Sequence, residues 1–408
     1  MVKIIADLQI HSKYARATSK DLSFENLEKY ARMKGINLLG TGDFQHPEHF
    51  KEIKKKLKED DKGILWTKTG FPFLWQTEVS LMYKQHEKRR AVHLLIFSPN
   101  GKVAEKIISY LGSKGRLDYD GRPIFGVSAK DLVKDLKLID GKIEIIPAHC
   151  LTPWFGLFGS KSGFNSIKEC FGDQTKHIYA VESGMSADPS MLWRFHEISN
   201  GGVRIVSFSD AHSFWPWRIG REATIFDLNE LSYENIIKAI RTGEGFKGTI
   251  ETPPKYGKYH YDGHRICNFS CSPDKTIKLK GICPVCNEPM IIGVDYRIEE
   301  IAKHPKGHKP LNSSDYIKLL PLHELIVLHT GQGISAKGNW MVYNSMIEKF
   351  GNELNILLNV NKEDLLKVEI PDKLVDLIIR NREQRIRVKP GYDGVYGVAL
   401  LEEQKKLF

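Results

Sequence analysis

Short apolar runs rich in β-branched residues alternate with helix-type patterns from Met1 to about Thr252. The run VKIIADL at residues 2–8 precedes an amphipathic stretch that opens on Ser23, a residue suited to an N-cap, and closes on Gly35. The same order recurs at INLLGTGD (36–43), KIEIIPAH (142–149) and VRIVSFSDAH (203–212). Repeated strand-then-helix order with buried-type strands predicts a parallel α/β architecture, either a closed barrel or an open sheet.

The α/β rhythm stops near residue 253, where Pro, Gly and Tyr dominate the stretch ETPPKYGKYHYDG. A compact segment with four clustered cysteines follows. The remaining chain has helical character around LHELIVLH (322–329) and NWMVYNSMIEKFG (339–351), with Gly-rich turns at HTGQGISAKGN and KPGYDGVYG. The sequence therefore predicts an α/β domain at 1–252, a small cysteine-containing domain at 253–296 and a helical domain at 297–408.

Metal-capable side chains stand at the predicted carboxyl ends of several strands, where parallel α/β folds build their sites. His93 lies early in its run and fits this scheme less well than the others. The set comprises Asp7, Gln9, His11, Asp43, His46, Glu78, His93, His149, Asp210 and His212. Taken singly, a histidine here could be a hydrogen-bonded core residue, and Asp43 could cap a helix. Buried together, so many charges require partners, and divalent metals such as Zn, Mn or Mg would supply them.

Two or three metals held by such a set favour phosphoryl chemistry, because they activate water and stabilise the leaving oxygen. The residues therefore predict a metal-dependent phosphoesterase. Its candidate catalytic side chains are Glu78, Asp210 and His212.

The cysteines of the middle segment have the spacing of a structural zinc site. Cys283 and Cys286 form a CxxC knuckle, whose partners are either Cys267 with Cys271 or His264 with Cys267. The spacing of His264 and Cys267 matches the second knuckle better. Closed sites with four such ligands stabilise a fold rather than catalyse, so we expect a small zinc ribbon in preference to a redox CxxC.

The net charge adds modest support for a polyanionic partner. The 408 residues include 60 Lys and Arg against 50 Asp and Glu, a formal excess of +10. The N-terminus lacks the layout of a signal peptide, and no apolar run reaches the ~18 residues of a membrane span. These features predict an intracellular, cytoplasmic or nucleoid-associated protein without a membrane partner.

Aromatic residues follow two of the metal-capable positions. They could stack on a base swung out of a DNA helix, or they could form the seam between the first domain and the rest of the chain. Neighbouring basic side chains could contact phosphates. The candidates for base and DNA binding are Trp154, Phe155, Phe214, Trp215, Trp217, Lys161, Arg218 and Arg221.

The segments DLQIHS, GDFQHP, TEVS, PAHC and SFSDAHS resemble the ordered motifs of the PHP (polymerase and histidinol phosphatase) domain. The resemblance implies a distorted seven-stranded (β/α)7 barrel with a trinuclear metal site. It places His11, Glu78 and Asp210 on one metal, Glu78, His93 and His149 on a second, and His46 and His212 on a third. Gln9 stands where the family's first motif has a histidine, and an amide oxygen is a weaker ligand than imidazole for zinc-like ions.

The order of these segments, a PHP region, then HRICNFSC…CPVC, then a helical region with PGYDGVYG, is similar to the endonuclease Q family along nearly the whole chain. That resemblance implies a DNA repair nuclease that uses metal-activated hydroxide to nick 5′ to hypoxanthine, uracil or an abasic site. It also implies a flipped nucleotide held between the barrel and the later domains. Two alternatives are a PHP phosphatase acting on small phosphomonoesters and a DNA-binding scaffold whose metal site is degenerate at Gln9.

The tail LEEQKKLF suggests a further partner. Gln404 and Leu407 begin the pattern by which peptides dock on a replication sliding clamp, although the terminal aromatic pair is incomplete after Phe408. The alternative is an ordinary polar tail.

Overall fold

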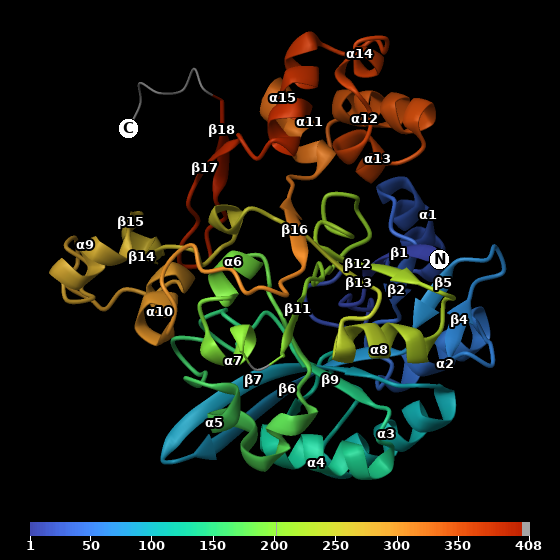
Figure 1. Ribbon diagram of the computed structural model, residues 1–408, viewed down its shortest axis with the longest axis vertical. Coiled ribbons are helices and arrows are strands. Elements are labelled where there is room, and N and C mark those ends of the chain that lie inside the picture. Colours follow the sequence, from blue (N-terminus) through green and yellow to red (C-terminus); the bar gives the residue numbers. More distant parts are fainter. Residues whose placement is uncertain (201, 402–408) are drawn as a thin grey trace.

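The computed structural model describes residues 1–200 and 202–401, which form an α/β region followed by a mainly helical C-terminal region (Figure 1). The predicted clamp-binding positions, Gln404 and Leu407, lie outside the described residues. Within the described part of the chain, no helix is both long and apolar enough to cross a membrane.

The largest sheet has eight strands and carries the N-terminal strand at its centre. Its order is β16 (Asp315–Lys318), β13 (Phe246–Glu251), β12 (Ala223–Leu228), β1 (Val2–Asp7), β2 (Leu38–Gly40), β5 (Pro72–Leu74), β4 (Ile64–Trp66) and β3 (Lys58–Glu59). The first strand pairs in parallel with β2 and antiparallel with β12. β16 comes from the predicted third domain, yet it pairs in parallel with β13 of the first.

A second sheet is built around a long hairpin, in the order β8 (Ile124–Phe125), β6 (Gln76–Gln85), β7 (Lys88–Phe97) and β9 (Glu144–Pro147). The turn of the hairpin is His86 and Glu87, with φ angles of 49° and 61°. Two residues at positive φ match the twist of an antiparallel pair and leave no room for a crossover helix. The expectation of a parallel α/β architecture was therefore wrong at β6 and β7, and also where β12 pairs antiparallel with β1 and β13 and where β7 pairs antiparallel with β9.

Two further strands, β10 (Ala180–Glu182) and β11 (Arg204–Val206), pair in parallel and fill the space between these sheets. β10 lies beside β9, and the chain after β11 meets the chain after β1 at a bridge between Ala211 and Ile10. The strand ends that carry the predicted metal-capable residues are thereby brought to one place. The described strands pair in several sheets, and a closed (β/α)7 barrel stays a prediction.

Helices cover the outside of this α/β region (Figure 1). The first begins after Ser23, whose side chain accepts a hydrogen bond from the Asn26 N–H, and ends at Gly35 with φ 97°, as the sequence predicts. The helices are α1 (Phe24–Lys34), α2 (Pro47–Lys56), α3 (Gly101–Lys114), α4 (Ala129–Ile139), α5 (Ile167–Phe171), α6 (Pro189–Leu192), α7 (His196–Ser199) and α8 (Tyr233–Thr242), with a 3₁₀ turn at Gly172–His177.

The cysteine-containing segment protrudes from one side of the molecule (Figure 1). It contains the hairpin of β14 (Asp262–His264) and β15 (Phe269–Cys271), α9 (Pro273–Lys278) and α10 (Val294–Ile301). α10 runs through the boundary predicted between residues 296 and 297. Two 3₁₀ turns, Pro254–Tyr256 and Arg265–Cys267, complete the segment.

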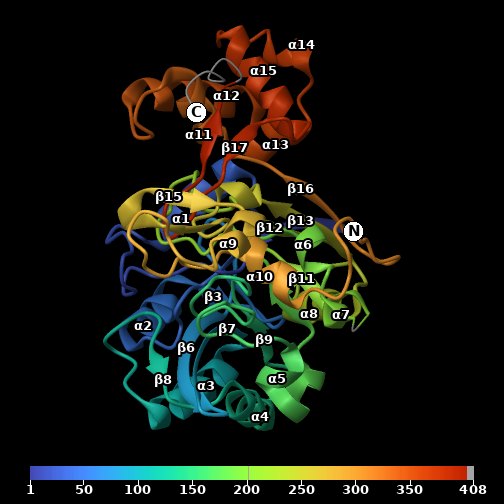
Figure 2. The ribbon, with the colours of Figure 1, turned by 90° about the vertical axis from the view of Figure 1, so that its left-hand side faces the viewer.

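The C-terminal helices form a separate cluster stacked over the α/β region (Figure 2). They are α11 (Leu322–Thr330), α12 (Lys337–Phe350), α13 (Glu353–Leu358), α14 (Lys362–Leu365) and α15 (Asp372–Arg382), followed by the hairpin of β17 (Arg387–Lys389) and β18 (Val398–Leu400). A buried ion pair fastens the cluster, because Lys34 Nζ lies 2.6 Å from Glu353 Oε1 and 2.8 Å from the Pro216 carbonyl oxygen. Removing either partner would leave a buried charge without compensation.

Three glutamates, Glu182, Glu222 and Glu251, are buried in the α/β region. Glu251 accepts hydrogen bonds from the hydroxyls of Ser183 and Ser207, both at 3.0 Å. Burial raises the pKa of Glu222 to about 7, and burial together with the neighbouring Glu222 raises the pKa of Glu251 well above its usual range. The folded protein therefore favours protonated carboxyl groups here.

We expect the Glu222→Gln variant to flatten the dependence of stability on pH. A carboxyl pKa raised on folding adds stability that is complete below the unfolded pKa of ~4.3 and is lost as the pH rises through about 7. Between pH 5 and pH 8, urea unfolding should show the native chain losing roughly 2 to 3 kcal/mol more than the variant. The exposed Glu234→Gln variant is the control, and identical pH profiles for Glu222→Gln and the native chain would contradict the account.

Candidate active site and metal centres

Six of the predicted metal ligands come together in two adjoining groups. One contains His11, Asp210 and His212, and the other contains Glu78, His93 and His149. Within each group, one potential ligand atom per residue lies within 4.8 Å of the others. β1, β6, β7, β9 and β11 position these side chains, so five strands distant in sequence build one site.

Glu78 faces both groups with its one carboxylate. Its Oε1 lies 2.7 Å from His93 Nδ1 and 3.6 Å from His149 Nε2, and its Oε2 lies 3.3 Å from His11 Nε2. The Glu78 side chain is fully buried between them. Each carboxylate oxygen is therefore available to a different group.

The donor atoms fit divalent metal ions. His93 Nδ1 and His149 Nε2 are 3.1 Å apart and both face Glu78 Oε1. In the other group, His11 Nε2 lies 3.1 Å from Asp210 Oδ1, and the rings of His11 and His212 are 4.5 Å apart. Mixed imidazole and carboxylate donors converging in this way suit Zn, Mn and related ions.

Asp43 orients His11 rather than joining a ligand group. Its Oδ1 lies 3.0 Å from His11 Nδ1, while its Oδ2 accepts hydrogen bonds from the N–H and hydroxyl of Ser12 at 2.6 and 2.7 Å. An acceptor at Nδ1 leaves the Nε2 atom of His11 free to bind a metal. Asp43, predicted as a ligand, thus lies one contact behind the groups, because both of its oxygens are already engaged.

Asp7 and Glu182 hold the loops that carry the ligands. The carboxylate of Asp7 accepts hydrogen bonds from the Ser209 N–H and hydroxyl at 2.9 and 2.5 Å and from the Gly220 N–H at 2.8 Å. Glu182 accepts one from the His149 N–H. Both oxygens of Asp7 are turned toward the backbone around Ser209 and Gly220, and its role as a metal ligand stays a prediction.

Three site residues have left-handed backbone conformations. The φ angles are 33° at Asp43, 31° at His149 and 48° at Asp210. Such values are uncommon outside glycine and persist where the surrounding contacts hold them. Each lies at the turn that ends a strand, so the strained turns direct these side chains toward the site.

Gln9 and His46 lie at the edge of this arrangement. Gln9 Nε2 donates to Glu78 Oε2 at 2.9 Å, while its buried Oε1 has no hydrogen-bond partner among the described residues. His46 stacks on Tyr14 with ring centres 4.5 Å apart, and burial lowers its pKa. His46 belongs to no ligand group of the described residues, so a third metal at His46 and His212 stays a prediction, as does metal binding by Gln9.

Arg122 is a site residue that the sequence pattern did not indicate. It follows α3 in an irregular segment, and its Nη1 lies 3.2 Å from Glu78 Oε1. A lone arginine in a loop carries no periodic signal, and its proximity to Glu78 depends on the pairing of β6 with β8. Arg122, Asp210 and His212 have side chains 29%, 33% and 32% exposed, so the site opens on this side.

Neighbouring charges set the protonation of Glu78 and His93. Burial raises the pKa of Glu78, but Arg122 and the histidines outweigh it and hold that pKa well below its usual range. Burial and Arg122 together lower the pKa of His93 to about 3, which leaves its ring neutral. A neutral imidazole beside an ionised carboxylate is the state in which both groups bind metals.

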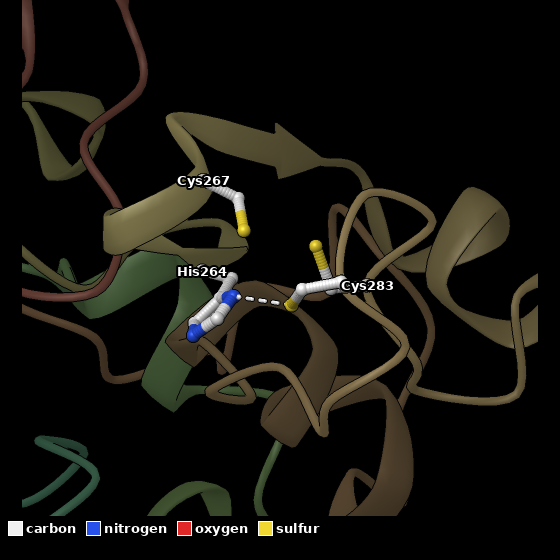
Figure 3. A group of neighbouring side chains, drawn as sticks. His264, Cys267 and Cys283 are labelled. Atoms are coloured by element: carbon white, nitrogen blue, oxygen red, sulfur yellow. Dashed lines mark hydrogen bonds between the residues drawn. The ribbon is translucent and has the colours of Figure 1, made fainter.

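His264, Cys267, Cys283 and Cys286 form a third ligand group. Figure 3 shows the side chains of His264, Cys267 and Cys283 gathered in the cysteine-containing segment. His264 Nδ1 lies 3.2 Å from Cys286 Sγ. Desolvation alone would raise the pKa of the Cys283 thiol. Hydrogen bonds from the backbone of Val285 and Cys286 outweigh this and lower that pKa to about 6. Cys271 is outside the group, because its buried Sγ contacts the Thr276 hydroxyl at 3.3 Å. Of the two arrangements that the sequence allowed, the structure has the one with His264.

The predicted base-binding aromatics divide into two sets. Phe214 and Trp217 are buried, and Trp215 stacks on Trp217 and contacts Trp340 of α12 at 5.7 Å between ring centres. This set forms the seam with the C-terminal helices, which was the alternative interpretation. Phe155 packs on the His93 ring at 4.3 Å, and Trp154 is 39% exposed. Phe155 therefore borders the His93 side of the metal groups, whereas the Trp154 ring contacts Tyr259.

The three predicted basic contacts also differ in their surroundings. Lys161 is exposed, and Arg218 is half-buried beside the Tyr396 ring. Arg221 is buried, and its guanidinium donates to the Ser209 carbonyl oxygen from Nε at 3.1 Å and from Nη2 at 2.9 Å. Arg221 thus supports the peptide before Asp210.

The ligand group around Cys283 predicts a metal whose loss destabilises the cysteine segment. We expect Cys283→Ser to lose one equivalent of bound metal and to lower the melting temperature, whereas the matched Cys271→Ser variant should retain the metal. Metal content by mass spectrometry, combined with thermal unfolding, tests this. Equal metal content in both variants would rule out the assignment.

The chain is similar to several known proteins. A family model described as the MJ0043 C-terminal domain matches residues 321–385. The uncharacterized protein MJ0043 of Methanocaldococcus jannaschii is 33% identical over 87% of this chain, which spans only 44% of that relative. The uncharacterized protein YqxK of Bacillus subtilis is 25% identical over 97% of this chain and 99% of its own length.

Two solved structures match the whole chain. The lesion-specific endonuclease PfuEndoQ of Pyrococcus furiosus aligns with a TM-score of 0.87, 30% identity and coverage of 100% of this chain and 98% of its own. Endonuclease Q in complex with a 27-mer duplex substrate bearing an abasic lesion at the active site aligns with a TM-score of 0.88 at the same identity and coverage. The chain belongs to the endonuclease Q family.

Proposed function

We propose that this protein is a metal-dependent DNA repair endonuclease that hydrolyses the phosphodiester 5′ to a deaminated base, hypoxanthine or uracil, or to an abasic site. The observation that carries the proposal is Glu78, whose two oxygens face two groups of metal-capable side chains. Two adjoining metal sites suit hydrolysis of a phosphodiester. The full-length likeness to endonuclease Q, including a complex with a lesion-bearing duplex, supports DNA as the substrate.

The chain supplies the ligands and the open face for this reaction. His11, Asp210 and His212 would hold one divalent ion, and His93 and His149 would hold a second, with the carboxylate of Glu78 available to both. Zn, Mn or Mg at these positions would lower the pKa of water and offset charge on the phosphate. Asp210 and His212 line the exposed side, where the scissile phosphate enters, and Arg122 adds positive charge there.

The remaining parts position the DNA. We assign residues 1–252 to the chemistry, residues 253–296 to a zinc-stabilised module and residues 297–408 to DNA binding. The damaged nucleotide is flipped out of the helix toward Phe155, which packs on His93, and toward the neighbouring exposed Trp154, and both rings offer flat surfaces for stacking. The sliding clamp stays a predicted partner of the tail.

A nicking assay tests the proposal. End-labelled duplexes carrying one hypoxanthine, one uracil or one abasic site are incubated with Mg²⁺ or Mn²⁺ and the native chain or the Asp210→Asn variant. We expect a single nick 5′ to each lesion, with the rate in the variant reduced by roughly 100-fold or more, because a metal ligand is weakened. Asp61→Asn, a change at an exposed carboxylate, is the matched control and should cut like the native chain.

Three results would contradict the proposal. Equal cutting of undamaged duplex would remove the lesion preference. Release of phosphate from small phosphomonoesters without nicking would favour a phosphatase. Full activity in Asp210→Asn would place the chemistry elsewhere in the protein.

A further inference from the structure

The segment between β17 and β18 returns from the C-terminal region to the α/β region and brings Tyr396 with it. Three backbone hydrogen bonds fix this segment, from Gly391 to the Lys255 oxygen at 2.8 Å, from Gly394 to the Lys258 oxygen at 3.0 Å and from Gly397 to the Tyr256 oxygen at 3.0 Å. A Cβ on Gly397 would lie 2.1 Å from the Lys255 oxygen, so glycine is needed for this close approach. The position of Tyr396 is therefore determined by the fold.

Three cations surround the Tyr396 ring. Lys258 Nζ lies 4.6 Å and Arg218 Cζ 5.6 Å from the ring centre, and Arg221 is the third. Burial would raise the pKa of Tyr396, but the three cations, Arg221 foremost, lower it below its ordinary value. We call these four residues the Tyr396 cluster.

Among the described residues, no carboxylate forms an ion pair with the cluster, although the charge of Arg221 opposes the rise in the pKa of Glu222. Within the described residues, Arg218, Arg221 and Lys258 form no ion pair within 4.0 Å, in contrast to Arg90, Arg241 and Lys34, which bind Glu169, Glu144 and Glu353. The acids in the neighbourhood are engaged elsewhere, since Glu324 bonds to Tyr256 and Asp393 accepts the Arg265 N–H. Positive charge gathered without an ion-paired carboxylate suits an anionic ligand.

Arg221 gives a second, independent indication of a ligand. It is 8% exposed, and its Nε and Nη2 donate to the Ser209 carbonyl oxygen, whereas its buried Nη1 has no acceptor within 3.5 Å among the described residues. The Arg221 side chain also interacts with Tyr396 and lowers the pKa of that phenol. A buried guanidinium donor without an acceptor is costly. Because Ser209 precedes Asp210, the unused donor lies next to the loop that carries a metal ligand.

We propose that Arg218, Lys258 and Tyr396, backed by Arg221, hold a DNA backbone phosphate that neighbours the phosphodiester at the metal groups. The inference rests on the proposed function and adds to it a second contact point on the same strand. A guanidinium, an ammonium and a phenol hydroxyl are all donors that phosphate oxygens accept. The Gly-rich PGYDGVYG turn thus completes a site whose other members lie in the first two regions of the chain.

Binding measurements at several salt concentrations test the cluster. An abasic-site duplex is titrated with the chain carrying Asp210→Asn, which prevents cutting, alone or with Arg218→Gln, Lys258→Gln or Tyr396→Phe. We expect each charge-removing change to weaken binding by about 3- to 10-fold and to lower the slope of log affinity against log salt by about 0.9, the value for one phosphate contact. Tyr396→Phe keeps the ring and should weaken binding with the slope unchanged. Lys102→Gln, on α3, is the control for loss of one surface charge.

Replacing single phosphates of the DNA by neutral groups then shows which phosphate the cluster contacts. Single methylphosphonates are placed one at a time along the strand to be cut, and each duplex is bound to the parent chain and to Arg218→Gln. We expect one position beside the scissile phosphate where the methylphosphonate weakens the parent but not the variant, because both changes remove the same contact. Strictly additive effects at every position, or an unchanged salt slope in Arg218→Gln and Lys258→Gln, would overturn the phosphate site.

The two proposals fail differently. Specific nicking by the native chain together with additive binding effects rejects the phosphate site and leaves the proposed function intact. Absence of nicking by the native chain rejects the proposed function, on which the assignment of this phosphate depends.

Discussion

The buried carboxylate of Glu78 is the constraint around which the site is organised. A fully buried negative charge between two strands is unfavourable unless cations or hydrogen-bond donors surround it. His11 and Gln9 approach one oxygen, and His93, His149 and Arg122 approach the other. The same convergence that stabilises Glu78 in the absence of metal also places imidazole nitrogens where two ions would share it.

The residues behind the site hold the neighbours of Glu78 in place. Asp43 fixes the ring of His11, Asp7 and Arg221 fix the peptide before Asp210, and Glu182 fixes the peptide of His149. These contacts also maintain the left-handed conformations at Asp43, His149 and Asp210. Strain stored at strand ends and offset by hydrogen bonds behind them is a common way to preorganise a site.

The sequence predicted site residues best where they lie at the end of a strand or in a spaced motif. The rule that strand ends converge placed His11, Glu78, His149, Asp210 and His212 in one site, and knuckle spacing favoured His264 over Cys271. The rule does not show which way a carboxylate turns, so the orientations of Asp7 and Asp43 could not be predicted from it. The β6–β7 hairpin escaped prediction because its turn has no glycine.

The positions of residues in irregular segments could not be predicted from the sequence pattern. Arg122 reaches Glu78 across 44 positions of the chain, and Tyr396 reaches Arg221 from the far end of the described sequence. The ring of Trp217 is covered by His323 of α11 and Trp340 of α12, and the periodicity of the sequence does not reveal such long-range contacts. These outcomes follow from long-range packing rather than from local pattern.

Metal stoichiometry of Glu78 variants tests the central claim most directly. Native protein, Glu78→Ala and His93→Gln are saturated with Mn²⁺, freed of unbound ions and assayed for metal per chain, with the ion of the cysteine group counted separately. If Glu78 joins the two groups, Glu78→Ala loses both site metals together, whereas His93→Gln loses one. Loss of a single metal, or of none, from Glu78→Ala would contradict a shared carboxylate.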